Sequence, residues 1–257
     1  PAGACPARLA LPACRSTSEA AERGTALHEF ARVVAVNPAA RAEALLKVPE
    51  EYRHTAAGMN LDNALEGLRV VGCETAYALN VETRTVRKIG TNINSNYNGE
   101  LKRQGLPALG RYEIPFSIDV EAFFGDTPVE LDYKSGKYIG DPAEHAQRNV
   151  CAIGLMLFYD AASAISRVAY IKDDGEIIPD GHEFTAFDVD DFCDRCMKTI
   201  DAVWDARLQF ANGIMPTVSR SELACGYCPE MDSCPYYTNL AKSMVGRLEA
   251  LESGPEF

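Results

Sequence analysis

Two alternating segments on either side of a turn constrain the fold of this chain more than any other feature. Residues 116–122 alternate between apolar and polar side chains, and residues 129–134 do the same. Gly125-Asp126 lies between them and is a signal for a two-residue turn. The sequence therefore predicts an antiparallel hairpin, with Phe116, Ile118 and Val120 on its apolar face.

A two-residue turn at Gly125-Asp126 sets the register of the hairpin. It places Asp119 directly opposite Asp132, at a Cβ separation of about 4.5–5.5 Å, with Lys134 one pleat further along the polar face. Two carboxylates held this close repel each other unless a cation lies between them. Glu121 and Glu130 also face each other in this register, and because they are nearer the turn we expect them to be solvated.

Opposed carboxylates followed by a lysine suit one kind of chemistry. Carboxylate oxygens are preferred ligands of Mg²⁺ and Mn²⁺. Such a metal polarises a phosphodiester and lowers the pKa of a bound water, and a nearby lysine orients that water or neutralises developing charge. Acids alternating with lysine are also common on solvated strands, so this pattern alone leaves a purely structural role open.

Composition narrows the class of protein. The 257 residues are 47% hydrophobic and 24% charged, which is typical of a globular chain and excludes disordered, collagen-like and coiled-coil classes. No apolar run reaches the length of a membrane span, and no secretory signal is apparent, so we expect a cytoplasmic protein without membrane contact. The formal charge of −12 requires any nucleic-acid site to be a local basic groove on an acidic body.

The other elements are expected from periodicity and turn signals. Thr25 is expected to cap a first helix, and a mobile loop is expected over residues 91–111, with Lys102, Arg103 and Arg111 as candidate phosphate contacts. A helix should begin at Asp141, where Pro and Glu follow in the first turn. The remaining expectations are helical structure over 38–68, two strands in 70–90, a strand over 165–171 and a helix over 188–211.

Nine cysteines, an odd number without a secretory signal, argue against a disulfide framework. The spacing of Cys225, Cys228 and Cys234 predicts metal or cluster ligation with a fourth thiolate, either as a 4Fe–4S cluster or as structural zinc. Cys193 and Cys196 compete as a zinc half-site, although their helical pattern favours buried free thiols.

Several short motifs, taken in order, resemble one family. The motifs are Cys-Pro-x-Arg at 5–8, Arg-Gly-Thr-Ala-Leu-His-Glu at 23–29, Ile-Asp at 118–119, Leu-Asp-Tyr-Lys-Ser-Gly at 131–136, Gln147, and the C-x2-C-x5-C of residues 225–234. This order is similar to the RecB-type branch of the PD-(D/E)XK nucleases. It most resembles the iron–sulfur-bearing members: CRISPR-associated RecB-like exonucleases, the AddB nuclease domain and phage RecB-like proteins.

The resemblance assigns roles to residues of this chain. It implies that His28, Asp119 and Asp132 bind the catalytic metal together with the backbone carbonyl of Tyr133, and that Lys134 is the catalytic lysine. Mg²⁺ or Mn²⁺ is the implied metal.

The resemblance also reaches residues outside the hairpin. Gln147 matches the start of the Q-x3-Y motif near the active site, but Cys151 stands where the family has Tyr. Glu74 resembles an acid often found on the preceding strand. The context of Cys5 implies that it is the fourth cluster ligand, with Cys14 as the alternative, and the family favours iron–sulfur over zinc.

Together these features predict an α/β fold with a PD-(D/E)XK restriction-endonuclease-like core, in which a mixed central sheet is flanked by helices. Residues 25–213 should form the nuclease core, and residues 1–24 and 214–253 a cysteine-ligated cluster subdomain that joins the chain ends. The expected function is hydrolysis of DNA phosphodiesters, as an exonuclease on single strands or ends, in recombination, repair or CRISPR-type processing. A non-catalytic DNA-end-binding partner and a zinc-stapled interaction protein are the alternatives. Cleavage polarity, DNA or RNA preference, exonuclease or endonuclease action, oligomeric state and pathway stay open.

Overall fold

The computed structural model describes residues 19–93, 96–135 and 146–216, together with Cys5, Cys228 and Cys234. The chain divides into two compact units, Ser18–Arg195 and Pro1–Thr17 with Cys196–Phe257. Most of the predicted cluster subdomain lies outside the described residues, so its boundaries stay a prediction.

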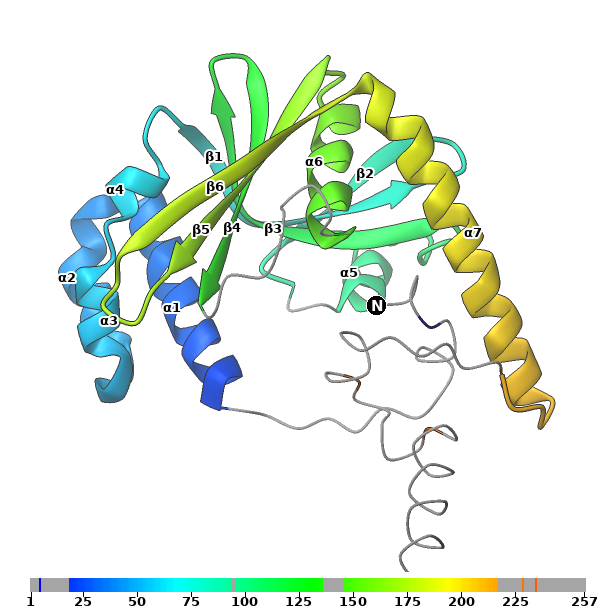
Figure 1. Cartoon of the computed structure of the whole chain (residues 1–257), viewed down its shortest axis with the longest axis horizontal. Helices are drawn as coiled ribbons and strands as arrows, with labels where there is room; N and C mark the ends of the chain where they lie inside the picture. The colour runs from blue at the N-terminus through cyan, green and yellow to red at the C-terminus, as the bar shows by residue number, and fades with distance from the viewer. Residues whose placement is uncertain are drawn as a thin grey trace, which may run out of the picture. The chain divides into compact units, whose positions relative to one another are not determined.

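One long helix and several short ones form the N-terminal part of the larger unit (Figure 1). The predicted cap at Thr25 is wrong: the first helix begins six residues earlier, and the Thr25 hydroxyl donates to the Ala21 carbonyl within it at 2.9 Å. The region 38–68 is helical as predicted, although broken into short pieces. These elements are α1 (Glu19–Val36), η2 (Pro38–Ala40), α2 (Arg41–Lys47), η3 (Glu50–Tyr52), α3 (Arg53–Gly58) and α4 (Leu61–Ala64).

A six-stranded mixed sheet in the order β2-β1-β3-β4-β5-β6 forms the centre of the unit. It confirms the predicted mixed sheet flanked by helices, including the two strands within 70–90 and the strand near 165–171. The strands are β1 (Arg69–Asn80), β2 (Thr85–Thr91), β3 (Glu113–Phe124), β4 (Thr127–Ser135), β5 (Ser163–Ile171) and β6 (Ile177–Thr185).

The β3–β4 hairpin has the register that its turn predicts. Gly125 has a φ of 58°, which favours glycine, at the first position of the two-residue turn. Five pairs follow from Phe124 opposite Thr127 to Val120 opposite Leu131, and Glu121 faces Glu130. The ladder therefore ends one residue before Asp119 and Asp132, which the same register places opposite each other.

The predicted alternation of β3 is only partly correct. Val120 packs in the core beside α1, whereas Phe116, expected on the same face, lies against Gly154 on the opposite side of the sheet. The sheet is irregular between Val120 and Ile118. On the neighbouring β1 strand, Glu74 lies between the residues paired with them and has a φ of 49°.

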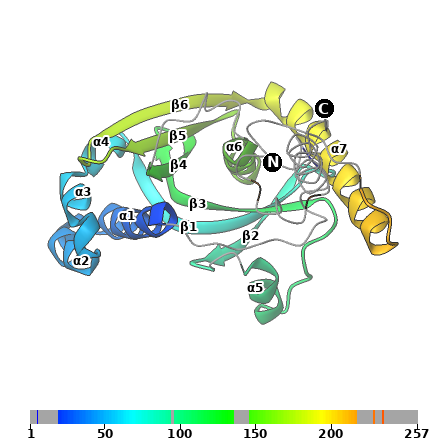
Figure 2. The same cartoon turned by 60° about the horizontal axis from the view of Figure 1, so that its bottom comes forward.

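Two layers of helix cover the sheet. The helices α1–α4 enclose a core that includes Leu27, Phe30, Leu131 and Tyr133 on one face. The other face carries α6 (Ala146–Phe158), the crossover that lets β5 run parallel to β4 (Figure 2). The predicted start of this helix at Asp141 lies outside the described residues.

The segment expected as a mobile loop contains a helix instead. The helix α5 (Tyr97–Arg103) begins after Asn96, whose side chain accepts from the Gly99 amide at 3.2 Å. The long helix expected near 188–211 is confirmed as α7 (Ala186–Ala211). Within the described residues, no helix is long and apolar enough to cross a membrane.

Candidate metal centre

The residues predicted to bind metal come from α1, β3 and β4. In α1, Gly24 lies so close to the end of β4 that a Cβ there would be 3.2 Å from Ser135 Oγ. His28, one helical turn later on the same face, has its Nδ1 3.3 Å from Asp119 Oδ2. The close approach of α1 thus brings the predicted histidine to the predicted aspartate.

Asp119 also holds the strand next to it. Its Oδ2 accepts the backbone N–H of Tyr133 at 3.0 Å, just beyond the end of the β3–β4 ladder. In an extended strand, the N–H and C=O of one residue point to the same side. The Tyr133 carbonyl, a predicted ligand, is therefore directed toward β3 as well.

Asp132 and Lys134 form an ion pair on β4. Lys134 Nζ lies 2.9 Å from Asp132 Oδ1, and the lysine side chain is 38% exposed. The second oxygen of Asp132 is buried and has no hydrogen-bond partner within the described part of the chain. A buried carboxylate oxygen without a partner is unfavourable and marks a position where a cation would be stabilised.

The electrostatics of the acids agree with this geometry. Burial, and then the neighbouring Asp132 carboxylate, raises the pKa of Asp119, while His28, the Tyr133 amide and Lys134 act in the opposite direction. Burial and the Asp119 carboxylate raise the pKa of Glu74, which lies between residues paired to either side of Asp119. The site concentrates negative charge in a poorly solvated place.

The donor set fits a hard divalent cation in charge and in type. Two carboxylates, an imidazole and a backbone carbonyl suit Mg²⁺ or Mn²⁺. Among the described residues, however, no three His, Cys, Asp or Glu side chains stand close enough together to hold one ion. Simultaneous ligation by His28, Asp119 and Asp132 therefore requires these side chains to draw closer.

Gln147 lies in the first turn of α6 and is exposed. It makes no hydrogen bond to the acids within the described chain. One turn later, Cys151 is buried, and its thiol lies 3.7 Å from the Ser117 carbonyl. Burial, followed by Glu130, Asp132 and Asp119, raises the pKa of Cys151. Cys151, which stands where the Q-x3-Y motif has Tyr, is thus a neutral thiol near these acids.

The prediction that Glu121 and Glu130 are solvated is wrong, because both are buried. Glu121 accepts hydrogen bonds from the Tyr77 hydroxyl at 2.9 Å and from the Tyr159 hydroxyl. Sequence alternation places these glutamates on one face but gives no signal that α6 and two tyrosines cover that face.

Glu130 belongs to a second buried polar group. It accepts from the Ser166 hydroxyl, which in turn accepts from Arg148 Nη2 at 2.7 Å. The Nε of Arg148 is 3.7 Å from Glu130 Oε1. Burial, and then the Asp132 carboxylate, raises the pKa of Glu130 to about 8. Arg148 is a buried cation of the α6–sheet interface.

The expected phosphate contacts Lys102, Arg103 and Arg111 are exposed. Arg103 pairs with Glu100 at 2.6 Å, and the Arg111 guanidinium carbon lies 5.3 Å from the centroid of the Tyr112 ring. Their role in DNA binding stays a prediction.

Three of the four predicted cluster ligands are described, and none of them is in a disulfide: Cys5 and Cys228 are partly buried, and Cys234 is buried. Cys225 and the alternative Cys14 lie outside the described residues. Cys193 is buried and Cys196 partly buried in α7, as expected for thiols in a helix. The cluster therefore stays a prediction.

Comparisons with known proteins add little to this geometry. No family model matches the chain, and no curated protein matches it. One solved structure, described as the crystal structure of SSO0001, is similar over 87% of this chain and 89% of its own, with 17% identity and a TM-score of 0.37. A likeness at that score gives no evidence about function.

Proposed function

We propose that this chain is a metal-dependent deoxyribonuclease of the RecB-type PD-(D/E)XK class, acting on single-stranded DNA or DNA ends. The observation that carries the proposal is the convergence of His28, Asp119, Asp132 and Lys134 just beyond the end of the β3–β4 ladder. A buried, unpartnered Asp132 oxygen and the raised pKa of Asp119 both favour a cation there.

Each residue has a role in the proposed reaction. Asp119, Asp132, His28 and the Tyr133 carbonyl would hold Mg²⁺ or Mn²⁺, which polarises the phosphodiester and acidifies a bound water. Lys134, partly exposed and paired with Asp132, orients the attacking water and neutralises charge that develops on the phosphate. The Asp119 carboxylate also fixes the backbone of Tyr133, so it positions the next residue, Lys134.

Support for the cofactors is of two kinds. The acid site rests on the geometry above, whereas the 4Fe–4S cluster, with Cys5, Cys225, Cys228 and Cys234 as ligands, rests on spacing and on the family resemblance. Zinc is the alternative metal for these thiolates. We assign the cluster a structural role, joining the two ends of the chain.

The test is a cleavage assay on end-labelled single-stranded and double-stranded DNA, with Mg²⁺, Mn²⁺ or a chelator. Lys134→Ala and Asp132→Ala should each lower the cleavage rate by roughly 100-fold or more, because each removes a group that acts in the transition state. Lys47→Ala is the matched control, since Lys47 is another lysine paired with a carboxylate, Glu43, at 2.7 Å on α2. Its rate should equal that of the parent.

Two results would contradict the proposal. Cleavage that persists in the chelator would exclude the metal mechanism. Unchanged rates for Lys134→Ala and Asp132→Ala would remove these residues from the active site. DNA binding without any cleavage would instead favour a non-catalytic end-binding partner, and tightly bound zinc with no DNA affinity would favour an interaction protein.

A further inference from the structure

Aromatic rings and cations follow one another along the edge of the face that carries α6. Arg69 lies over the Phe123 ring at 4.8 Å, and Phe123 contacts Tyr159 edge-on at 4.9 Å between centroids. Tyr159 contacts Phe158 at 5.1 Å, and Phe158 contacts Tyr77 at 4.8 Å. Lys88 lies 5.7 Å above the Tyr77 ring. We call these six residues the aromatic–basic strip: Arg69, Tyr77, Lys88, Phe123, Phe158 and Tyr159.

The strip is open to solvent where a ligand would contact it. Phe158 is 37% exposed and Tyr159 is 36% exposed, and both cations are exposed. Within the described part of the chain, neither Arg69 nor Lys88 pairs with a carboxylate. Two unpaired cations beside exposed rings stand out on a protein whose formal charge is −12.

The exposed tyrosine is held in one orientation from below. Its hydroxyl donates to Glu121, which also accepts from the buried Tyr77. These hydrogen bonds fix the orientation of the Tyr159 ring, so it loses little conformational freedom when a flat ligand stacks on it.

We propose that the aromatic–basic strip binds single-stranded DNA, with bases stacked on Tyr159 and Phe158 and phosphates near Arg69 and Lys88. Aromatic faces interleaved with cations suit a single strand, because every unpaired base offers a π-face and every nucleotide a phosphate. A duplex hides its base faces, so it lacks the surface that these rings recognise. The two cations of the strip also complement the negative charge of the phosphates.

The location of the strip deepens the proposed function, on which this part of the inference rests. Phe123 is four residues beyond Asp119 on β3, which corresponds to about 13 Å along an extended strand. A strand that occupies the strip can therefore have a phosphodiester at the candidate metal centre a few nucleotides away. The strip would select single strands for that centre.

The experiment measures binding of fluorescently labelled oligo(dT) and of a duplex of equal length, in a buffer with a chelator so that no cleavage intervenes. The decisive pair is Tyr159→Leu and Tyr159→Phe. Both remove the hydroxyl that bonds to Glu121, but only the second keeps the ring. Tyr159→Leu should weaken oligo(dT) binding roughly 5- to 150-fold relative to Tyr159→Phe, as expected for one stacked base.

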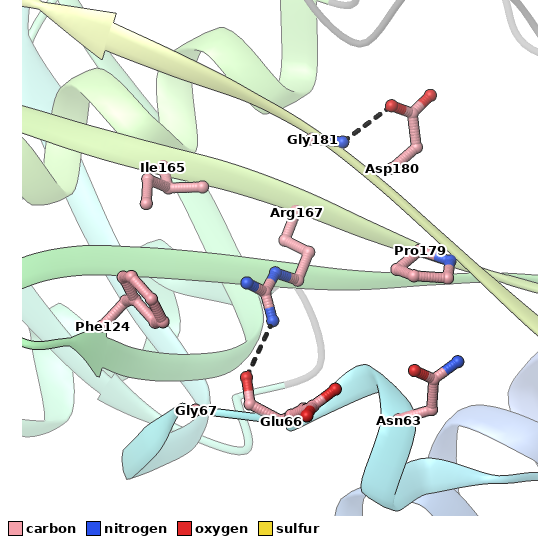
Figure 3. Close-up of a pocket in the computed structure, with 9 residues that line it drawn as sticks. All are labelled: Asn63, Glu66, Gly67, Phe124, Ile165, Arg167, Pro179, Asp180 and Gly181. Atoms are coloured by element: carbon pink, nitrogen blue, oxygen red, sulfur yellow. Dashed lines mark hydrogen bonds between the residues drawn. The ribbon is translucent and has the colours of Figure 1, made fainter.

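Phe124 provides the matched control. It is the next residue along β3 and is 52% exposed, but it lines a different cavity of about 710 Å³ with Arg167 and Pro179 (Figure 3). Phe124→Leu should leave oligo(dT) affinity unchanged. Arg69→Gln with Lys88→Gln should reduce the slope of log affinity against log salt by roughly 1.4, because two phosphate contacts are lost.

Equal oligo(dT) affinity for Tyr159→Leu and Tyr159→Phe, at equal melting temperatures, would overturn the inference, as would an equal loss for Phe124→Leu. Because binding is measured without divalent cations, failure of the nuclease proposal leaves these outcomes readable. A chain that cleaves DNA but shows no ring dependence has the proposed function and lacks the strip as a site. If binding depends on the ring but no DNA is cleaved, the strip is a binding site and the nuclease proposal fails.

Discussion

Replacing Glu130 with Leu should destabilise the protein strongly, because it leaves the buried Arg148 guanidinium without its counter-charge. Above the Glu130 pKa of about 8, where this carboxyl is ionised, the two unit charges 3.7 Å apart attract by about 4–5 kcal/mol at an effective dielectric constant of about 20. Loss of one partner of a buried pair typically costs about 3–5 kcal/mol. For a unit of this size, that free energy corresponds to a decrease in Tm of roughly 6–20 °C.

Replacing the other partner should cost less. In Arg148→Met, the buried Glu130 carboxyl can take up a proton, since burial and Asp132 already raise its pKa to about 8. Arg148 has no such option, because guanidinium stays charged at any accessible pH. The double variant, Glu130→Leu with Arg148→Met, should recover most of the loss, because no uncompensated charge remains.

Differential scanning calorimetry on the four proteins at about pH 9, above the Glu130 pKa of about 8, measures these differences. Glu130→Leu should have the lowest Tm of the four proteins. The parent, the double variant and Arg148→Met should all melt at higher temperatures. A double variant as unstable as the sum of the two single variants would refute the reasoning, because it would show that the charges do not act as a pair. An equal loss for the two single variants would refute the asymmetry between a carboxyl and a guanidinium.

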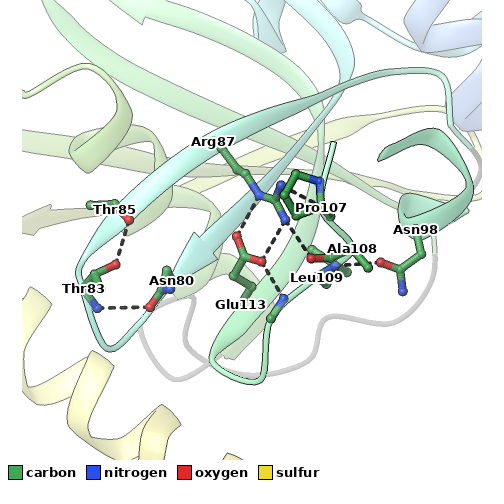
Figure 4. Close-up of polar contacts among 10 residues, drawn as sticks. Asn80, Thr83, Thr85, Arg87, Asn98, Pro107, Ala108, Leu109 and Glu113 are labelled. Atoms are coloured by element: carbon green, nitrogen blue, oxygen red, sulfur yellow. Dashed lines mark hydrogen bonds and ion pairs between the residues drawn. The ribbon is translucent and has the colours of Figure 1, made fainter. Parts of the chain in front are cut away.

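Four further predictions follow from separate features. Arg87 pairs with Glu113 at 2.7 Å and donates to the carbonyls of Pro107 and Ala108 (Figure 4), so Arg87→Gln should lower the free energy of unfolding by about 1–3 kcal/mol in urea titrations. Glu74→Asn should raise Tm by a few degrees, because asparagine tolerates the φ of 49° better than glutamate does. The logarithm of DNA affinity should fall linearly with log salt despite the charge of −12, and a salt-independent affinity would contradict phosphate contacts. Freshly purified protein should be brown and contain iron and sulfide, and Cys228→Ser should bleach and destabilise it, whereas a colourless protein with one zinc would favour the zinc reading.

The sequence predicts the hairpin well because its determinants are local. Gly125 and Asp126 fix a two-residue turn, and from that turn the period-2 geometry of a strand determines which residues face each other. The opposition of Glu121 and Glu130 in the structure follows directly, and so does the placement of Asp119 and Asp132 at the next level.

The elements that pack around the hairpin are not predictable from local sequence in the same way. The burial of Glu130 is not predictable from the hairpin alone. Its partners, Arg148 and Ser166, lie on α6 and β5, and their approach depends on how these elements pack. The helix over Tyr97–Arg103 was missed because asparagine, glycine and charged residues have low or mixed helix propensity, whereas an Asn96 cap and the burial of Leu101 stabilise it. Local rules set register, and packing decides burial.

The early end of the β3–β4 ladder, at Val120 and Leu131, has a consequence for how the protein folds. The hairpin can close from its turn as a local, low-contact-order event without first forcing Asp119 and Asp132 together. The level of the acids needs α1, which brings His28, and β5, which pairs with Asp132 through Val168 from more than 30 residues along the chain. The candidate catalytic end of the hairpin is therefore completed late, when these distant segments dock, and a chain arrested before that step would have its central strands but no metal centre.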